Sequence, residues 1–351
     1  MRKTADTIDG VLGRFRRSRL LIVGDLMLDE FVWGKVSRIS PEAPVPVVWV
    51  QRESHMPGGA ANVANNVSAL GGQVAVIGVV GTDRWGSRLL EELSARKIDT
   101  SGVLTLNRPT TVKTRVIAHH QQVVRVDREQ PEPLADGTIE RLIAAVAERL
   151  AAADAIVIED YGKGLITRKL LGAVIPLARK QRKLITVDPK EEHFELYHRV
   201  TALTPNRAEA GAAMGRELKR DSEVREAGLE LLRRLQCDGV LITLGEDGMW
   251  LFEPGGRERR IPTVAQEVFD VAGAGDTVIA AFTLALASGA SMEQAARIAN
   301  QAAGIVVGKL GVAVVTPSEL RAALEPRAKV PPGTTRRPAH RRPSSGVSAR
   351  R

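Results

Sequence analysis

Short apolar runs recur along this chain, and longer segments with helical spacing separate them. The runs lie at residues 20–23, 74–80, 155–158, 184–187, 202–204 and 240–244. Each run is almost continuously apolar, which is typical of parallel strands that helices cover on both faces. The helical segments lie at about residues 61–70, 85–96, 138–152, 167–181, 206–214, 221–235, 275–288 and 292–308. This alternation predicts an α/β fold with a doubly wound, mostly parallel central sheet flanked by helices.

Two stretches, residues 45–50 and 110–126, interrupt this alternation with strand-like sequence and no intervening helix. In residues 111–116, polar side chains alternate with more apolar ones, which is typical of a small antiparallel sheet with one solvated face. We therefore expect a small β-sheet lid built from two insertions, at about residues 31–55 and 108–128.

The positive charge of the chain is concentrated at its C-terminal end. The chain holds 50 Lys and Arg against 41 Asp and Glu, a formal net charge of +9. Eight of the 50 basic residues and none of the acidic ones lie after residue 325, so residues 1–325 hold 42 basic and 41 acidic residues. We expect one folded domain over residues 1–325 and a basic disordered tail over residues 326–351. A nearly neutral body gives no support for nucleic-acid binding.

The cysteine content and the apolar runs limit the compartment in which we expect this protein. The single cysteine, Cys237, excludes an intramolecular disulfide and a cysteine-based zinc site. The run at residues 20–23 is too short for a signal peptide, and residues 278–287 fall well short of the roughly 20 residues that span a bilayer. We expect a cytoplasmic protein with no membrane partner.

The strongest local motif is Asp-Val-Ala-Gly-Ala-Gly-Asp-Thr at residues 270–277, directly before an apolar helix. Its small residues leave the amides of residues 273–276 uncovered at a helix N-terminus, where amides and the helix dipole favour an anion. Asp276 could accept a proton from a substrate hydroxyl at that place. A glycine turn with Asp276 as a helix cap explains the same residues equally well.

A second motif places Gly58 and Gly59 before a helix that carries Asn62. The glycines permit close backbone approach by a ligand, and the amide of Asn62 offers a donor and an acceptor to a polyol. Taken alone, a tight turn and a small-residue packing helix explain these residues better.

A third motif places Asn206 and Glu209 at a strand-to-helix junction, three residues apart and on one helix face. Their oxygens suit hydrated Mg²⁺. Taken alone, an acid that complements the helix dipole is the simpler explanation of Glu209.

Polar loops at residues 159–164, 188–190 and 243–248 follow three of the apolar runs. Ligands bind at the carboxyl ends of parallel strands, so we expect these loops to converge, although residues 243–248 alone indicate a hairpin turn. The sequence contains neither a Walker A motif nor a Gly-x-Gly-x-x-Gly motif after a strand, the two commonest nucleotide-binding motifs.

Together, and in this order, these motifs resemble those of the ribokinase-like (PfkB) carbohydrate kinases, over about residues 20–320. The resemblance rests on the early Gly-Gly-Ala-Ala-Asn motif that ends at Asn62, the late Gly-Ala-Gly-Asp motif that ends at Asp276, and Asn206-x-x-Glu209 between them. It implies an ATP- and Mg²⁺-dependent sugar kinase. One departure is Val271, which stands where many members carry Thr.

The resemblance also assigns roles to individual residues. Asp276 is implied as the catalytic base, with Gly273, Ala274 and Gly275 as the anion hole, and Asn206 with Glu209 as the residues that hold Mg²⁺. The residues implied for ATP binding are Lys190, Asn206, Thr243, Gly245, Gly248, Asn300, Ala303 and Gly304. The residues implied for sugar binding are Asp29, Arg38, Gly58, Gly59, Asn62, Lys113, Arg115 and Asp160.

Within this family, the greatest likeness is to the kinases that phosphorylate heptose 7-phosphate on its anomeric hydroxyl. It rests on residues 24–29, 38–46, 113–115 and 160–164. The likeness implies conversion of D-glycero-β-D-manno-heptose 7-phosphate to the 1,7-bisphosphate, on the way to the heptose of lipopolysaccharide core. We expect the sugar's phosphate to bind among Lys113, Arg115 and Arg38.

Two alternatives remain open from the sequence alone. One is a kinase of another phosphosugar or of a nucleoside, and the other is a non-catalytic scaffold with a basic tail. By family analogy, and because exposed sheet edges invite pairing, we also expect a homodimer formed through the lid.

Overall fold

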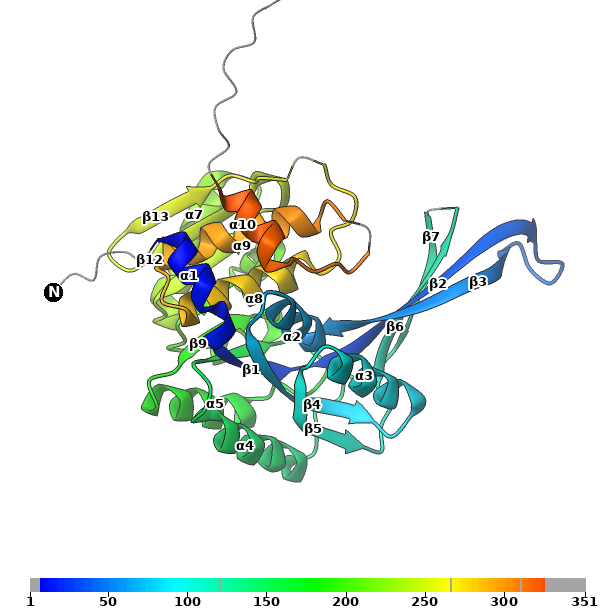
Figure 1. The fold of residues 1–351 in the computed structure, drawn as a ribbon, viewed down its shortest axis with the longest axis horizontal. Helices are drawn as coiled ribbons and strands as arrows, with labels where there is room; N and C mark the ends of the chain where they lie inside the picture. Colours follow the sequence, from blue (N-terminus) through cyan, green and yellow to red (C-terminus); the bar gives the residue numbers. More distant parts are fainter. Residues whose placement is uncertain (1–6, 120, 266, 310, 326–351) are drawn as a thin grey trace, which may run out of the picture.

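The computed structural model describes residues 7–119, 121–265, 267–309 and 311–325, so the expected tail at residues 326–351 lies outside the described residues. A large helix-flanked sheet forms the body, and a smaller sheet projects from it as an arm (Figure 1). The expected α/β fold with a β-sheet lid is confirmed.

The central sheet has nine strands within the described residues. In sheet order they are β13 (Arg257–Ile261), β12 (Met249–Glu253), β11 (Gly239–Thr243), β10 (Ala202–Leu203), β9 (Leu184–Asp188), β8 (Ala155–Glu159), β1 (Arg19–Gly24), β4 (Gln73–Gly81) and β5 (Asp99–Leu106). Every pairing from β11 to β5 is parallel, and only β12 and β13 pair antiparallel. The carboxyl ends of the parallel strands therefore share one edge, as doubly wound sheets require.

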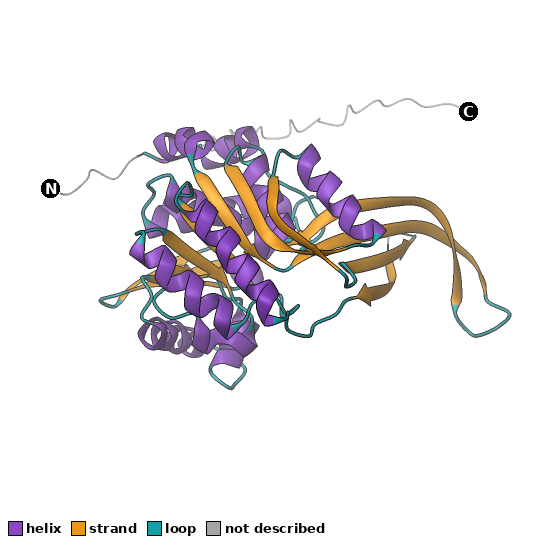
Figure 2. Cartoon of the chain, turned by 90° about the horizontal axis from the view of Figure 1, so that it is seen from below, coloured by secondary structure: helices purple, strands orange, loops and turns teal. Residues whose placement is uncertain are grey.

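Helices cover both faces of this sheet (Figure 2). One layer contains α2 (Ala60–Ala69), α3 (Arg84–Ala95), α8 (Ala274–Ala287) and α9 (Met292–Val306). The other contains α4 (Asp136–Leu150), α5 (Arg168–Lys180), α6 (Arg207–Ala213) and α7 (Asp221–Leu235). In β1, Leu20 and Ile22 belong to the first core while Leu21 and Val23 belong to the second. Burial on both faces explains why the apolar run in this strand is continuous.

The lid sheet contains β3 (Pro46–Gly59), β2 (Leu26–Ile39), β6 (Thr111–Ala118) and β7 (Gln121–Arg128), in that order. The β2–β3 and β6–β7 pairs are antiparallel, as expected. The central β2–β6 pair is parallel, so the expectation of an antiparallel sheet is corrected at this pairing. Both insertions leave the body at its carboxyl edge and run outward together, which makes their first strands parallel.

Several elements were not predicted from the sequence. They are β5, β13, the helices α1 (Ile8–Arg14) and α10 (Pro317–Leu324), and the 3-10 helices η1 (Phe15–Arg17), η2 (Glu191–Leu196) and η3 (Gly245–Asp247). Residues 99–106, at an edge of the sheet, begin with three polar residues and a glycine, so they lack the continuous apolar run of the inner strands. Among the described residues, no helix combines the length and the apolar character that crossing a bilayer requires.

Candidate active site

The N-terminus of α8 supports the expected anion site. Gly273 caps the helix with φ 74°, a left-handed conformation that glycine adopts without strain. The Ala274 amide donates to the Val271 carbonyl at 3.2 Å, so this amide is not free as expected. The described residues supply no acceptor for the amides of Gly275 and Asp276. These two donors, at the positive end of a 14-residue helix, can bind an anionic oxygen.

Asp276 lies in the first turn of α8 and is only 4% exposed. Its Oδ2 accepts a hydrogen bond from Nδ2 of Asn62 at 2.5 Å, and its Oδ1 accepts one from the Tyr161 hydroxyl at 2.7 Å. Burial raises the pKa of Asp276 from its ordinary value of 3.8 to about 6, although the two hydrogen bonds oppose this rise. A carboxylate with a pKa near neutrality is suited to general-base catalysis.

The early glycine motif brings α2 and β2 next to this carboxylate. A Cβ on Gly58 would lie 2.5 Å from Oδ2 of Asp29, and one on Gly59, where φ is 54°, would lie 2.7 Å from the Asp25 carbonyl. A Cβ on Gly273 would likewise lie 2.7 Å from Nδ2 of Asn62. These glycines therefore permit close packing around the site, whatever they contribute to sugar binding.

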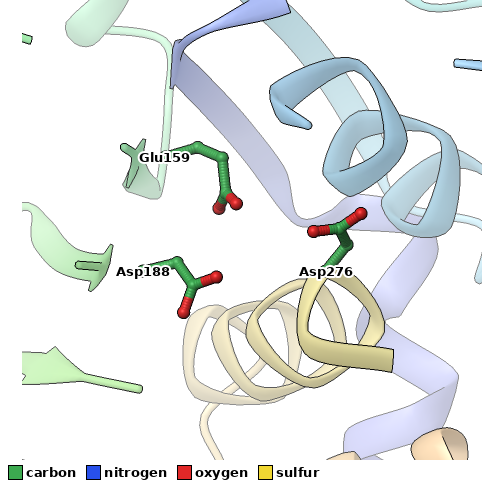
Figure 3. A group of neighbouring side chains, drawn as sticks. All are labelled: Glu159, Asp188 and Asp276. Atoms are coloured by element: carbon green, nitrogen blue, oxygen red, sulfur yellow. The ribbon is translucent and has the colours of Figure 1, made fainter. Parts of the chain in front are cut away.

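Three carboxylates meet at the carboxyl edge of the sheet: Glu159 at the end of β8, Asp188 at the end of β9, and Asp276. One oxygen from each lies within 4.8 Å of the others, and Figure 3 shows the groups turned toward a common space. Glu159 is fully buried, and neither of its oxygens has a hydrogen-bond donor among the described residues.

Burial and the neighbouring negative charges raise the pKa of Glu159 and of Asp188 well above their ordinary values. Neither residue was predicted to belong to the site. The available signal was that each is the acidic residue that ends an apolar strand.

Asn206 and Glu209, expected to hold Mg²⁺, form a capping box at the start of α6. The Asn206 side chain accepts from the Glu209 amide at 2.9 Å, and Glu209 accepts from the Asn206 amide at 2.8 Å. Burial raises the pKa of Glu209, and its charge in turn raises the pKa of Asp188. Both side chains therefore serve the helix cap, and the charge of Glu209 also acts on the carboxylate cluster.

A cavity of 440 Å³ lies beside the N-terminus of α8. Most of the residues expected to bind ATP line it, namely Thr243, Gly245, Gly248, Asn300, Ala303 and Gly304. Ala274 and Gly275 line it as well, so the cavity opens onto the anion site. Asn206 and Lys190 are not among its lining residues, and Nζ of Lys190 pairs with Glu191 at 2.7 Å. The structure thus brings six of the eight expected residues together.

Near the body, the lid brings Asp29 of β2 beside Arg115 of β6, and the two form an ion pair. Lys113 on the same strand makes no ion pair within the described residues, and its Nζ lies 5.7 Å from the centre of the Tyr161 ring. Arg38 is nine residues beyond Asp29 on β2, which corresponds to about 30 Å at roughly 3.3 Å per residue. The structure therefore does not bring Arg38 to Lys113 and Arg115 within one chain.

Asp160, expected to bind sugar, has protein donors on both carboxylate oxygens. Its Oδ1 accepts from the Gly162 amide at 2.9 Å, and its Oδ2 contacts Nδ1 of His193 at 2.6 Å and the Tyr197 hydroxyl at 2.7 Å. These contacts order the loop after β8. Among the described residues, they leave no oxygen of Asp160 without a protein partner.

Asp25, which was not predicted to belong to the site, supports this loop from the other side. Its carboxylate accepts from the amides of Tyr161 and Lys163 at 3.0 Å and from that of Leu165 at 3.3 Å. The two carboxylates of Asp25 and Asp160 thereby fix the backbone that aims Tyr161 at Asp276.

The buried carboxylate of Asp276 at a helix N-terminus, two amides without acceptors, a carboxylate cluster and a cavity thus lie together at the carboxyl edge of an α/β sheet. The sequence matches the model of the pfkB family of carbohydrate kinases over residues 17–319, so the chain belongs to this family. It is therefore a phosphotransferase that acts on a sugar hydroxyl.

Two relatives show how far the similarity extends. The chain is 44% identical over 312 residues to a "Bifunctional protein HldE" of Desulfatibacillum aliphaticivorans, and 46% identical over 314 residues to the protein of that name from Geobacter metallireducens. Each match covers 89% of this chain and 64% of the relative. The chain thus spans somewhat less than two thirds of the length of these curated relatives.

Solved structures show the same fold. Arabidopsis thaliana ribokinase, complexed with ribose and ATP, matches with a TM-score of 0.70 at 21% identity, covering 88% of this chain and 99% of that one. Escherichia coli phosphofructokinase-2, in complex with substrates and products, matches with a TM-score of 0.73 at 21% identity, covering 87% and 98%. The fold is ribokinase-like, as the sequence motifs implied.

Proposed function

We propose that this protein transfers the γ-phosphoryl group of ATP to the anomeric hydroxyl of D-glycero-β-D-manno-heptose 7-phosphate and forms the 1,7-bisphosphate. The observation that carries the proposal is the position of Asp276, between the cavity suited to ATP and the lid cation Lys113. The lid and loop motifs and the similarity to proteins named HldE favour a heptose phosphate as acceptor. Because ATP is the proposed phosphoryl donor, we also propose that the protein acts in the cytoplasm.

In the proposed reaction, Asp276 accepts the proton of the anomeric hydroxyl as its oxygen attacks the γ-phosphorus in line with the leaving ADP. The amides of Gly275 and Asp276 donate to the oxygens of the transferring group, where negative charge is concentrated. Asn62 holds the carboxylate of Asp276 in place. Positioning and charge stabilisation supply most of the catalysis in this kind of transfer.

The residues at the carboxylate cluster fit a Mg²⁺ ion. The two unpartnered oxygens of the fully buried Glu159 lie beside Asp188, and burying uncompensated negative charge is costly. Carboxylate oxygens are the ligands that Mg²⁺ prefers. We assign the ion to Glu159 and Asp188, with Glu209 acting through water and Asn206 serving as the cap that orients Glu209. When bound, Mg²⁺ supplies positive charge to the ATP phosphates.

For the sugar's own phosphate we propose Lys113, with Arg115 beside it. Burial, and then the charge of Lys163, lower the pKa of Lys113, which lacks an ion pair among the described residues. A phosphate dianion would supply the missing opposite charge. Arg115 is already paired with Asp29, so Lys113 is the principal free cation in this assignment.

We further propose that two copies pair through the lid. The arm exposes apolar side chains on both of its edge strands and at its tip, namely Ile39, Val45, Trp49, Val50, Val123, Val124 and Val126. Exposed apolar surface and free strand edges favour association. Trp49→Glu should convert a dimer to a monomer in sedimentation velocity, and an unchanged sedimentation coefficient would contradict this interface.

A turnover screen tests the substrate assignment. ADP release is measured with ATP and Mg²⁺ in the presence of heptose 7-phosphate, unphosphorylated heptose, ribose, fructose 6-phosphate or adenosine, and phosphorus NMR identifies the product. We expect the highest kcat/KM with heptose 7-phosphate and a new phosphate on the anomeric carbon. Preference for another phosphosugar or for adenosine would replace the heptose assignment and retain the kinase. Absence of turnover with every acceptor would favour the non-catalytic scaffold.

A further inference from the structure

Both oxygens of the proposed base have side-chain donors in the structure. Asn62 donates to Oδ2 of Asp276 at 2.5 Å and Tyr161 donates to Oδ1 at 2.7 Å. A group that accepts a proton from an acceptor hydroxyl needs an oxygen that can receive that hydroxyl's hydrogen bond. One of the two donors must therefore move, or share its oxygen, when the acceptor arrives.

The two donors are held very differently. Asn62 is 1% exposed on α2, and Nδ2 of Asn66 donates both to its carbonyl at 2.9 Å and to its Oδ1 at 3.3 Å. Tyr161 lies on the loop after β8 and is partly exposed. The Asp25 carboxylate holds the backbone amide of Tyr161, but Asp276 is the sole described hydrogen-bond partner of its hydroxyl. Rotation of the phenol can therefore release Oδ1 while the backbone stays in place.

The phenol ring also lies next to the proposed sugar site. Nζ of Lys113 is 5.7 Å from the centre of the Tyr161 ring, within the range of a cation–π attraction. An anionic acceptor that forms an ion pair with Lys113 weakens the cation–π attraction between Lys113 and the Tyr161 ring. Acceptor binding is thereby coupled to release of the Tyr161 hydroxyl from Asp276.

We propose that Tyr161 suppresses ATP hydrolysis by occupying the acceptor position on Asp276 until a sugar hydroxyl displaces it. In the suppressed reaction, a water oxygen forms a bond to the γ-phosphorus and the bond from that phosphorus to the β,γ-bridging oxygen breaks. The water proton passes to Asp276, and ADP and inorganic phosphate leave. This inference rests on the proposed role of Asp276 as base.

The test compares hydrolysis with transfer in Tyr161→Phe, which removes the hydroxyl and keeps the ring beside Lys113. ATP hydrolysis without sugar should rise at least tenfold, whereas transfer to the sugar should stay within about threefold of wild type. Their ratio does not depend on the fraction of folded enzyme. Ser68→Ala is the control, because it removes a hydroxyl that donates to the Arg96 carbonyl at 2.7 Å and contacts neither Asp276 nor the loop of Tyr161. Hydrolysis by this control should stay at the wild-type level.

A ratio that does not rise in Tyr161→Phe overturns the proposal, as does an equal rise in Ser68→Ala. If Tyr161→Phe fails to fold, Tyr161→Met keeps an apolar side chain beside Lys113 and is judged by the same ratio. In the double variant with Asp276→Asn, the gain in hydrolysis should disappear, and a persistent gain would overturn the proposal. Asp276→Asn alone tests whether Asp276 is the base. If this variant loses transfer to the sugar, but the ratio of hydrolysis to transfer does not rise in Tyr161→Phe, only the role of Tyr161 is rejected.

Discussion

The side-chain amide of Asn62 donates to the carboxylate of Asp276 across a sequence separation of 214 residues. The contact joins the early glycine motif on α2 to the late one on α8, and a side chain on Gly273 would obstruct it at 2.7 Å. The two motifs therefore form one unit, in which the first orients the base that the second presents.

Asp276→Asn keeps the shape of the side chain and removes the base. We expect kcat for the sugar to fall by about 10²–10⁴, the usual contribution of general-base catalysis. Affinity for Mg-ATP, measured by calorimetry, should change little, because Asp276 does not line the cavity proposed for ATP. Turnover near the wild-type rate would remove Asp276 from the mechanism.

The pKa of Asp276, raised by burial to about 6, predicts two opposite effects of pH. Activity should decline below about pH 6 as the base becomes protonated. Folding stability should respond in the other direction, because ionising this group costs more in the folded chain than in the unfolded one.

With EDTA present, the free energy of unfolding should fall as pH rises from about 4 through 6, by up to about 3 kcal/mol from this group, since one pKa unit corresponds to about 1.4 kcal/mol. Urea unfolding at several pH values measures this, and Asp276→Asn should lack that part of the decline. Identical pH curves for the two proteins would show that Asp276 ionises normally.

Alanine substitutions at two nearby glycines, Gly273 and Gly275, should distinguish an effect on catalysis from an effect on folding. A Cβ on Gly275 would meet only Oδ2 of Asp188, at 3.9 Å, so Gly275→Ala should melt near the wild-type temperature while its methyl group obstructs the anion site. Gly273→Ala combines a positive φ with a contact of 2.7 Å to Asn62, so it should lower both Tm and kcat. We expect kcat of Gly275→Ala to fall at least tenfold, and full activity would place the phosphoryl group elsewhere.

Glu159→Gln tests the magnesium assignment. Loss of the carboxylate should raise the Mg²⁺ concentration needed for half-maximal activity more than Glu209→Gln does, because Glu159 is assigned as a direct ligand. In EDTA, Glu159→Gln should also melt above wild type, since a buried acid without donors is removed. Glu195→Gln, at an exposed glutamate outside the cluster, is the control. A Mg²⁺ titration of Glu159→Gln that overlays wild type would exclude Glu159 as a ligand.

Lys113→Met tests recognition of the sugar's phosphate. KM for heptose 7-phosphate should rise at least tenfold while KM for ATP stays nearly constant, because only the sugar is assigned to this cation. Arg115→Met is a less specific variant, since it leaves Asp29 buried without its partner, at a cost of about 3–5 kcal/mol for a broken buried pair. An unchanged KM for heptose 7-phosphate in Lys113→Met would exclude Lys113 from phosphate recognition and retain only the assignment as a sugar kinase.

The parallel part of the fold follows from the sequence because its strands are buried on both faces. The run predicted at residues 155–158 became β8 (Ala155–Glu159) and that at 184–187 became β9 (Leu184–Asp188). Edge strand β5 was missed because one face is exposed and its apolar residues are interrupted. The parallel pairing of β2 with β6 was missed because alternation reveals which residues share a face but not which strand lies alongside.

Those parts of the site that are formed by consecutive residues could be predicted from the sequence. The α8 N-terminus needs only its own sequence, and so does the glycine loop after β11. The loops that begin at Glu159 and Asp188 were predicted to converge, but the cluster of these two carboxylates depends on the register of β8 with β9, which the sequence does not display. Asn206-x-x-Glu209 satisfies a helix cap and a metal-site pattern alike, so only its setting reveals that Asn206 serves the cap.

Between β1, which ends at Gly24, and β2, which begins at Leu26, Asp25 is the only connecting residue, and it also holds the loop of Tyr161. Farther out, the β2–β3 pairing already shifts register at Trp33/Gly34. If arms are exchanged between family members, the junction should therefore lie at the register shift at Trp33/Gly34 and not at Asp25. Replacing the arm beyond Gly34 should change its length and its pairing with a partner and leave the catalytic residues in place. Replacing it from Asp25 would disrupt both the arm and the loop of Tyr161.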